Sequence, residues 1–353
     1  MTAKRILITG ASGCIGHYFT EQLIQTTDHE LFILVRDPAK LQFDSKARPG
    51  IELLTADLRE ISQFDALLKT IQVAILAATS WGGIQEAYEI NVTQTLALIQ
   101  ALDPSVCEQV LYFSTESILA QNNQLLPEAG ELGTDYIRTK YQCFRALEKL
   151  NLELNLDKIP PITALFPTFV FGGDANKPYS HLTSGFPEVL RWIGLIRFLT
   201  TDASFHFMHG YDIAQVVCHC VDQPEVARRF ADGVTGDSVT GGDDAIDRGN
   251  LPNSARPIAK IILGNAPITL DETIQEVCDY FGKRIYLRFP IKLWLAEFLI
   301  RVFRIQVGDW DRFCLRYRHF VHQNPVSPRL LGLVPYAGTL TDILKIYRFE
   351  QRP

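Results

Sequence analysis

A tyrosine and a lysine four positions apart, Tyr136 and Lys140, are the side chains of this chain best suited to transfer a proton. At this spacing two residues share one face of a helix. A phenol has an ordinary pKa of about 10, too high for a base near neutral pH. A cation about 4 Å away, at an effective dielectric near 20, favours the phenolate by about 4 kcal/mol, or roughly three pKa units. The pair therefore indicates acid–base chemistry at a substrate oxygen, with Lys140 lowering the pKa of the phenol.

A glycine-rich turn near the N-terminus is the second feature with a clear chemical use. It reads TGASGCIG over residues 9–16, after a predicted strand and at the start of a predicted helix. Gly10 permits a tight turn, Gly13 lets backbone amides approach a pyrophosphate, and Gly16 allows close contact between helix and sheet. The turn predicts dinucleotide binding, and the residues that would line the cofactor are Gly10, Ala11, Ser12, Gly13, Cys14, Ile15 and Gly16.

The end of the second predicted strand decides between NAD and NADP. A carboxylate there accepts hydrogen bonds from the ribose 2′-hydroxyl of NAD, whereas a guanidinium can hold a 2′-phosphate with two hydrogen bonds. Arg36 comes first, with Lys40 four residues later, which favours NADP, and Asp37 keeps NAD open. Asp57, followed by Leu58, comes after the third strand, and it has two open roles: contact with the adenine edge or capping of the next helix.

Two kinds of segment alternate through the first half of the chain and would position these side chains. Continuously apolar runs are typical of parallel strands covered on both faces. They occupy Arg5–Thr9, Leu31–Val35, Ile51–Thr55, Val73–Ala78, Val110–Ser114 and Ile162–Phe166. Apolar residues at helical spacing lie between them at Cys14–Thr26, Ile61–Thr70, Ile84–Leu102 and Thr134–Leu150. The alternation predicts a doubly wound α/β sheet.

Length and composition place the chain among ordinary globular proteins. It has 353 residues, 47% hydrophobic and 21% charged, and its 34 basic and 40 acidic residues argue against a nucleic-acid partner. Seven cysteines without CxxC spacing predict free thiols in a reducing compartment. The first strand follows the N-terminus without a signal segment, and no run of 18 apolar residues occurs, so a cytoplasmic location is expected.

Together with further motifs, the glycine turn and the Tyr136–Lys140 pair resemble the short-chain dehydrogenase/reductase superfamily. The length resembles its extended branch, the NAD-dependent epimerase/dehydratase-like proteins. By this resemblance, Lys140 would also hold the nicotinamide ribose, and Thr115 would be the catalytic hydroxyl that hydrogen-bonds the substrate oxygen. The remaining cofactor-lining residues would be Ala77, Ala78, Thr79, Asn91, Phe166, Pro167 and Thr168.

The resemblance implies two parts. Residues 1–173 would form a Rossmann domain with the catalytic residues, and residues 174–353 mainly a smaller, mostly helical substrate domain. Residues 205–230 would return to the Rossmann core, and the Gly-, Asp- and Ser-rich stretch 231–256 would be a flexible loop. Helical patterns in the second part occupy Phe186–Leu199, Thr269–Phe281 and Ile291–Ile305.

Two details of the second part bear on partners. The aromatic, aliphatic and basic residues of 291–305 suit a helix in a membrane interface, although a helix covering its own core is the commoner case. Peripheral membrane contact therefore stays open, as do the monomer and the homodimer. His206, His209 and His219 lack a carboxylate cluster, so we expect packing or hydrogen-bonding roles and no metal site.

Departures from the family pattern narrow the substrate class. Phe166 and Phe205 stand where sugar-nucleotide enzymes of this branch carry basic residues for the substrate diphosphate. The aromatic residues expected nearby are Trp81, Phe166, Phe169, Phe171, Phe186 and Trp192, most of them with a core-packing role. A small, rather apolar substrate therefore fits better. Glu116 resembles one member of the acid pair of sugar dehydratases, but the second member is Ser117.

The chain is thus expected to be an NAD(P)-dependent oxidoreductase that transfers hydride to or from a carbonyl or alcohol, with NADP favoured over NAD. Two other functions stay open. A sugar-nucleotide epimerase or dehydratase would keep NAD tightly bound, and an assembly factor or scaffold would bind the cofactor without turnover. The presence of Thr115, Tyr136 and Lys140 favours an enzyme, because a scaffold needs no proton-transfer group.

Overall fold

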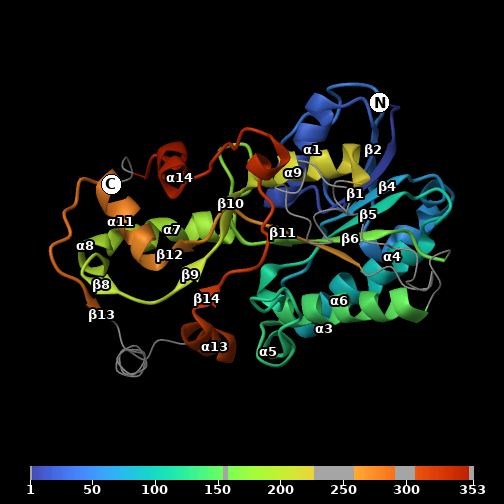
Figure 1. The fold of residues 1–353 in the computed structure, drawn as a ribbon. Helices are drawn as coiled ribbons and strands as arrows, with labels where there is room; N and C mark the ends of the chain where they lie inside the picture. The colour runs from blue at the N-terminus through green and yellow to red at the C-terminus, as the bar shows by residue number, and fades with distance from the viewer. Residues whose placement is uncertain (1, 154–157, 226–257, 291–306, 350–353) are drawn as a thin grey trace, which may run out of the picture.

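The computed structural model describes residues 2–153, 158–225, 258–290 and 307–349, and every structural statement below concerns these ranges. Figure 1 shows a sheet flanked by helices in one half of the molecule, and further helices and short strands in the other. The predicted loop 231–256 and the predicted helix 291–305 lie outside the described residues. Within the described ranges, no helix is both long enough and apolar enough to cross a membrane.

A seven-stranded parallel sheet forms the first half, with strand order β11-β6-β5-β4-β1-β2-β3. The strands are β1 (Arg5–Thr9), β2 (Glu30–Val35), β3 (Ile51–Thr55), β4 (Val73–Leu76), β5 (Gln109–Phe113), β6 (Ile162–Pro167) and β11 (Ala259–Leu263). The predicted α/β class and its six predicted strands are confirmed, whereas β11 is an additional strand. The strand order reverses between β1 and β4, and ligands bind at the carboxyl ends of such strands.

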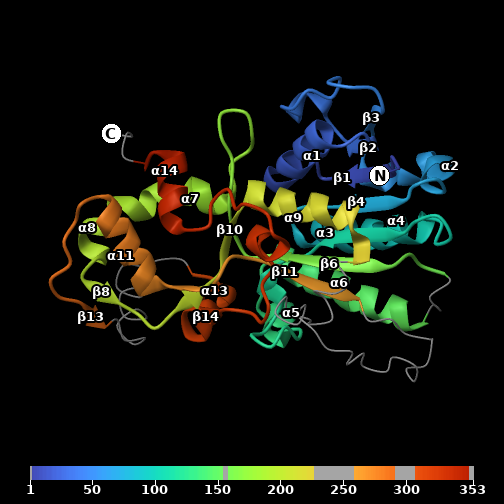
Figure 2. The ribbon, with the colours of Figure 1, turned by 45° about the horizontal axis from the view of Figure 1, so that its top comes forward.

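Helices cover both faces of the sheet (Figures 1 and 2). On one face, α1 (Cys14–Thr26) packs along α9 (Gly210–Asp222). On the other face, α4 (Thr95–Ala101) and α6 (Asp135–Glu153) cover a second core that includes Phe144. Each central strand is therefore buried on both sides, which explains why its sequence is continuously apolar rather than alternating.

The helix predicted over Ile84–Leu102 is interrupted. It begins as α3 (Ile84–Tyr88), widens into a π-helical turn, η3 (Glu89–Gln94), and continues as α4. π-helical turns occur frequently at functional sites. This one contains Asn91, which was selected from the sequence as a cofactor residue, and buries it completely.

The second half has its own core. Its helices are α7 (His181–Arg191), α8 (Ile193–Ile196), α11 (Leu270–Tyr280), α13 (Asp309–Tyr317) and α14 (Leu340–Tyr347). Its strands pair as β7 (Phe169–Phe171) with β10 (Phe207–His209), β9 (Ser204–Phe205) with β12 (Ile268–Thr269) and β14 (His319–Phe320), and β8 (Leu199–Thr200) with β13 (Phe289–Pro290). Short elements complete the described chain: η1 (Pro38–Lys40), η2 (Leu58–Phe64), α2 (Asp65–Leu68), η4 (Glu116–Ile118), α5 (Pro127–Glu131) and η7 (Pro328–Leu331). The helix predicted over Thr269–Phe281 is confirmed as α11.

Candidate active site

The glycine turn after β1 has a backbone that only glycine accommodates. Gly10 adopts φ +78°, and a Cβ on this residue would overlap the backbone of Ala77 and Ala78. A Cβ on Gly16 would overlap the carbonyl of Gly10. The two glycines therefore let α1 and the segment after β4 approach the turn, and they bring the predicted cofactor residues Ala77 and Ala78 beside it.

The N-terminus of α1 fits a bound pyrophosphate. Gly13 is the N-cap residue and is exposed, no side chain caps the helix, and its first turn contains no acidic residue. The first backbone N–H groups of the helix are therefore available to an anion, which the helix dipole also favours. The backbone N–H of Gly13 donates to the carbonyl of Gly10 at 3.0 Å, so the N–H groups of Cys14 and Ile15 are the donors that would hold the phosphates of a dinucleotide here.

Arg36 and Asp37 follow β2 and have different surroundings. The Arg36 side chain is 66% exposed, and its Nη1 lies 3.8 Å from Oδ2 of Asp57. Asp37 caps η1, where its Oδ1 accepts a hydrogen bond from the backbone N–H of Ala39 at 3.0 Å. Lys40, at the end of η1, is exposed. Arg36 and Asp37 are thus both exposed, Asp37 with one carboxylate oxygen engaged in the cap and Arg36 beside the carboxylate of Asp57.

Asp57 caps the helix that follows it, which is one of its two predicted roles. Its Oδ1 accepts a hydrogen bond from the backbone N–H of Arg59 at 3.0 Å, and Glu60 completes a capping box. Nε of Arg59 lies 2.7 Å from the same oxygen, and this hydrogen bond holds the pKa of Asp57 below its ordinary value. The cap starts η2 at Leu58, a buried residue, so helical structure begins before the predicted residue Ile61. Contact of Asp57 with adenine stays a prediction.

Asn91 ties the segment after β4 to the helix α6. Its amide oxygen accepts hydrogen bonds from the backbone N–H of Ser80 (2.8 Å) and the hydroxyl of Thr79 (2.9 Å). Its amide nitrogen donates to the carbonyl of Ser80 and the hydroxyl of Thr139, both at 2.9 Å. Thr139 lies between Tyr136 and Lys140 on α6. Asn91 therefore links the segment Thr79–Ser80, which follows β4, to the helix that carries Tyr136 and Lys140.

The three predicted catalytic residues lie together at the carboxyl end of β5. Nζ of Lys140 lies 6.0 Å from the centre of the Tyr136 ring, one turn away on α6. The same Nζ donates a hydrogen bond to the carbonyl of Phe113, the last residue of β5, at 2.8 Å. The hydroxyl of Thr115, two residues further, donates to Oγ of Ser117 at 3.3 Å, and the Thr115 side chain also acts on the phenol of Tyr136, whose pKa it lowers. The arrangement can position a carbonyl oxygen and exchange a proton with it.

Burial sets the protonation of this cluster. It raises the pKa of Tyr136 to about 12, and the hydrogen bond with Thr115 acts in the opposite direction. It lowers the pKa of Lys140 to about 8. The lowered phenol pKa expected from the sequence is thus wrong, because Lys140 is itself desolvated and bonded to a backbone carbonyl. Tyr136 therefore keeps its proton at neutral pH, as a proton donor requires.

Trp81 lies flat against the ring of Tyr136. The two ring centres are 3.8 Å apart with 13° between their planes, and His181 contacts the indole edge-on at 4.8 Å. The indole is 56% exposed. Of the aromatic residues predicted near the substrate, the exposed ones are Trp81, Phe169 and Trp192, and the buried ones are Phe166, Phe171 and Phe186. The surface beside Tyr136 is therefore bordered by an aromatic plane.

Phe166 and Thr168, predicted to line the cofactor, direct their side chains elsewhere. Phe166 is fully buried against Phe144, with ring centres 5.4 Å apart. The hydroxyl of Thr168 donates to the carbonyl of Leu263 on β11 at 2.8 Å. Pro167 between them ends β6. The side chains of Phe166 and Thr168 therefore stabilise the packing around β6 and β11. Only the backbone of residues 166–168 is left for contact with a cofactor.

The histidines and cysteines have structural environments. Nδ1 of His209 accepts the backbone N–H of Tyr211 at 3.1 Å, Nε2 lies 3.1 Å from the hydroxyl of Tyr347, and burial lowers the pKa of His209 to about 4. His206 also forms hydrogen bonds within the core. All seven cysteines are free and five of them are buried, as predicted. In the described part of the chain, no cluster of His, Cys, Asp and Glu side chains could hold a metal ion.

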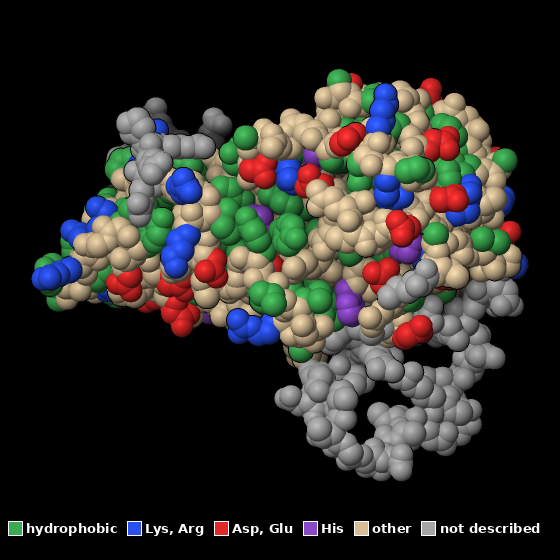
Figure 3. All heavy atoms as spheres, turned by 90° about the horizontal axis from the view of Figure 1, so that it is seen from above, with side chains coloured by type: hydrophobic (Ala, Val, Ile, Leu, Met, Phe, Trp, Pro, Cys, Tyr) green, Lys and Arg blue, Asp and Glu red, His purple; other side chains and the backbone are tan. Residues whose placement is uncertain are grey.

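A separate cavity of about 660 Å³ lies where α1, α7, α9 and α14 meet, on the face shown in Figure 3, where hydrophobic side chains gather near the middle. Its lining includes Tyr18, Tyr211 and Tyr336. Lys177 lies within it, 2.8 Å from a carboxylate oxygen of Glu21. Because the catalytic candidates do not line it, this cavity is distinct from the candidate active site.

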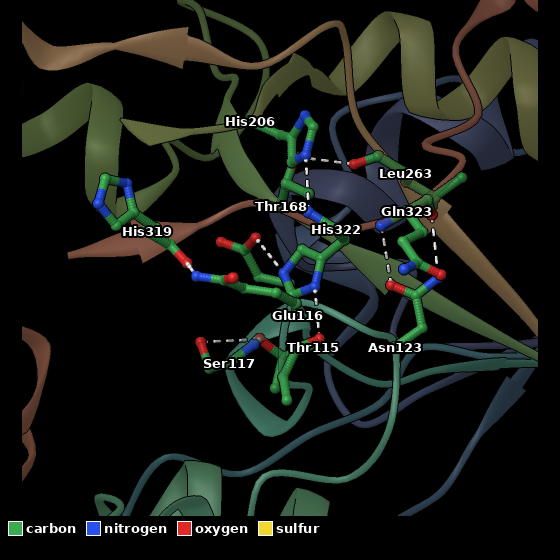
Figure 4. A network of polar contacts seen from close by, with 12 residues as sticks. Thr115, Glu116, Ser117, Asn123, Thr168, His206, Leu263, His319, His322 and Gln323 are labelled. Atoms are coloured by element: carbon green, nitrogen blue, oxygen red, sulfur yellow. Dashed lines mark hydrogen bonds and ion pairs between the residues drawn. The ribbon is translucent and has the colours of Figure 1, made fainter. Parts of the chain in front are cut away.

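Glu116 follows Thr115 but is directed into the protein, where Figure 4 shows its carboxylate against the ring of His322. Oε2 of Glu116 lies 3.2 Å from Nε2 of His322, and the side chains are only 5% and 1% exposed. Burial raises the pKa of Glu116, and the contact with His322 opposes this change. This pair cannot be predicted from sequence, because nothing in the local pattern around His322 indicates a partner about 200 positions earlier in the chain.

Comparison with known proteins shows the family. The model of the NAD dependent epimerase/dehydratase family matches residues 6–231, more than half of the chain. The protein belongs to this family and is an NAD(P)-binding protein of the extended short-chain dehydrogenase/reductase type.

One curated protein and several solved structures are similar to this chain. Over 88 residues, 25% of this chain, the sequence is 33% identical to quinone oxidoreductase 2 of Escherichia coli K12, and the match spans 30% of that protein's length. The crystal structure of gox2253 aligns over 99% of both chains with a TM-score of 0.64 and 18% identity. The dTDP-glucose 4,6-dehydratase of Bacillus anthracis, solved in complex with NAD, aligns over 99% of this chain and 98% of that one with a TM-score of 0.60 and 11% identity. These structures show the same fold.

Proposed function

We propose that the protein is an NADP-dependent reductase that converts the carbonyl group of a small, apolar, preferably aromatic substrate to an alcohol. The observation that carries the proposal is the aromatic plane of Trp81 stacked on a protonated Tyr136, beside Thr115 and Lys140. When bound, the cofactor supplies the hydride. The chain must then orient the carbonyl, donate a proton to its oxygen and select the substrate.

The protonation state of Tyr136 supports reduction as the proposed direction of reaction. With a pKa of about 12 the phenol holds its proton at neutral pH, so it can donate to an oxygen on which negative charge develops. Thr115, whose hydroxyl now donates to Oγ of Ser117, would turn to give that oxygen a second hydrogen bond. By resemblance to the family, Lys140 would hold the nicotinamide ribose, and its carbonyl contact fixes the side chain for that role.

The substrate class follows from what borders Tyr136. Stacked aromatic pairs gain about 0.5–1.5 kcal/mol beyond the burial of area, so the exposed indole of Trp81 favours a planar substrate. Phe205 stands where sugar-nucleotide enzymes of the branch place a basic residue, and it packs edge-on against Phe169 at 5.3 Å. Glu116, the residue that resembles a dehydratase acid, is buried against His322, so a substrate does not reach its carboxylate. The similarity to quinone oxidoreductase 2 supports an aromatic or quinone carbonyl.

The choice of NADP rests on the end of β2. One carboxylate oxygen of Asp37, which could accept the ribose hydroxyl of NAD, is engaged as a helix cap, and the side chain of Arg36 is 66% exposed. A guanidinium can bind a 2′-phosphate through two hydrogen bonds.

The test is to follow NADPH oxidation with aromatic aldehydes, quinones, aliphatic aldehydes and sugar nucleotides as substrates. We expect turnover with the aromatic carbonyls, and the Trp81→Ala variant should raise their KM about 3–10-fold while the KM of aliphatic aldehydes changes little. Trp81→Phe serves as the matched control, because it keeps an aromatic plane.

Two outcomes would replace the proposal. Turnover of a sugar nucleotide by protein that retains NAD through purification would indicate an epimerase or dehydratase. Tight cofactor binding without turnover of any of these substrates would indicate a scaffold.

A further inference from the structure

The turn at residues 120–123, which follows the candidate catalytic residue Thr115, forms hydrogen bonds with the segment 317–323, about 200 positions later in the chain. Nε2 of Gln121 donates to the carbonyl of His319 at 3.2 Å. Asn123 and Gln323 exchange two hydrogen bonds, at 2.9 and 3.1 Å. Figure 4 shows these contacts around the Glu116–His322 pair. The C-terminal half of the protein thus determines the position of a turn in the first half.

Oε2 of Glu116 and Nε2 of His322 are both buried, and neither atom has another hydrogen-bond partner among the described residues. Nδ1 of His322 lies 3.2 Å from the carbonyl oxygen of Ala120, and a carbonyl only accepts, so Nδ1 carries a hydrogen. In a neutral imidazole Nε2 then has none. The 3.2 Å contact of Nε2 with Oε2 of Glu116 is attractive only if one proton joins them, either as imidazolium and carboxylate or as imidazole and carboxylic acid.

Neighbouring groups leave this proton undisturbed. Nδ1 of His206 donates to the carbonyl of Asn265 at 2.8 Å, so its Nε2 accepts the backbone N–H of His322 at 3.0 Å and the His206 ring is neutral. Burial also lowers the pKa of His206. From α13, Cys314 faces Glu116, and burial raises the pKa of this thiol to about 12. Within the described residues, these two neighbours therefore carry no charge at neutral pH.

We propose that Glu116 is a positioning residue, which with His322 fixes the turn η4 so that the hydroxyl of Thr115 meets Tyr136. Glu116 is the first residue of η4, and Thr115 is its cap, with its hydroxyl oxygen 3.4 Å from the backbone N–H of Ser117. A shift of Glu116 must move the peptide that carries Thr115. The pair is buried, so it acts through Thr115 and does not touch the substrate. This inference rests on the proposed reductase function only for its kinetic readout.

A double-mutant cycle tests the kinetic part. Glu116→Ala should lower kcat about tenfold with the KM of NADPH unchanged within about twofold, and Thr115→Ala should lower kcat about 100-fold. If Glu116 acts through Thr115, adding Glu116→Ala to Thr115→Ala should cost less than about twofold more. Glu116→Gln should recover most of the loss, because its amide N–H can donate to the neutral Nε2 of His322. The exposed residue Glu131 gives a control, since Glu131→Ala should leave kcat unchanged.

A measurement without substrate keeps the inference separate from the proposed function. The NMR signal of the Thr115 methyl group, identified by its loss in Thr115→Ala, should shift in Glu116→Ala and return in Glu116→Gln. Glu116→Asp, which withdraws the carboxylate while retaining most of the volume, replaces Glu116→Ala if the latter does not fold. An unmoved methyl signal, or kinetic losses that multiply in the double variant, would overturn the positioning role. A shifted signal without turnover of any carbonyl would overturn only the reductase function.

Discussion

Thr115 and Glu116 are consecutive residues in two regions with opposite surroundings. Thr115 belongs to the cluster of Tyr136 and Lys140, which borders the exposed indole of Trp81. Glu116 belongs to a pair with His322 that solvent barely reaches. Both regions contain groups capable of acid–base chemistry, so the type of side chain does not determine which region a substrate can reach. The course of the backbone between Thr115 and Glu116 determines it, because it directs the two side chains to different surroundings.

The two regions also differ in how their charges are balanced. In the cluster of Thr115, Tyr136 and Lys140, the open cluster, no salt bridge to Lys140 is found within the described residues, and burial shifts the pKa of Tyr136 and of Lys140 toward the neutral form. In the closed pair, Oε2 of Glu116 and Nε2 of His322 lie 3.2 Å apart and have no other hydrogen-bond partner among the described residues, so each side chain depends on the other. Changes in the closed pair should therefore act mainly on stability, and changes in the open cluster mainly on activity and ligand binding.

The largest effect on stability is expected from His322→Phe. The substitution leaves Glu116 buried without its partner, which should lower the free energy of unfolding by about 3–5 kcal/mol. Urea denaturation at neutral pH measures the loss. Combining His322→Phe with Glu116→Leu should restore most of it, because two apolar side chains of similar volume leave no buried charge. A single variant within about 0.5 kcal/mol of the parent protein would show that the pair is not closed.

In contrast to His322→Phe, Tyr136→Phe should lower activity and leave stability nearly unchanged. It removes the proton-donating oxygen and keeps the ring stacked on Trp81, so kcat should fall about 100-fold or more while cofactor affinity stays near that of the parent protein. Tyr141→Phe, on the same helix, is the matched control and should retain full activity. If Tyr136→Phe is fully active, the Tyr136–Lys140 spacing is a coincidence and the open cluster is not catalytic.

The open region could be predicted from sequence because local patterns specify it. The six predicted strands are continuously apolar, and the glycine turn and the Tyr136–Lys140 pair lie within short segments beside them. Since the carboxyl ends of parallel strands meet at one edge, Thr115 and Tyr136 had to approach each other.

The closed region could not be predicted, because its partners come from distant segments. His322 lies just before Val326, which forms a β-bridge with Leu263 at the end of β11. No spacing in the sequence relates His322 to Glu116. The lowered pKa expected for Tyr136 failed for a related reason. The spacing gives the proximity of Lys140, whereas the bond to the Phe113 carbonyl and the burial of the ammonium come from the folded sheet.

Arg36→Ala tests whether Arg36, at the end of β2, selects NADP over NAD. If Arg36 binds the 2′-phosphate, its loss should weaken NADP binding by about 1.5–3 kcal/mol, the range for a charge-assisted hydrogen bond, and leave NAD binding nearly unchanged. Calorimetric titration of both cofactors measures the difference. Arg191→Ala, at an exposed arginine of α7, should change neither affinity. Equal weakening for NAD and NADP, or a parent protein that prefers NAD, would contradict the NADP assignment.

The smallest expected effect concerns Lys140 and the pH dependence of stability. Its pKa is about 8 in the folded protein and about 10.4 in an unfolded chain, so between these values the unfolded state binds more protons. The free energy of unfolding should therefore rise with pH, by about 1.5 kcal/mol between pH 8 and 9.5, as the buried ammonium loses its charge. Lys140→Met should lack this rise. Urea denaturation of both proteins across the same pH range isolates Lys140, because the cysteines and tyrosines that titrate in both contribute equally to the two curves. Parallel curves would mean that Lys140 is already neutral or remains charged throughout, and that the open cluster, like the closed pair, has its proton fixed by a partner.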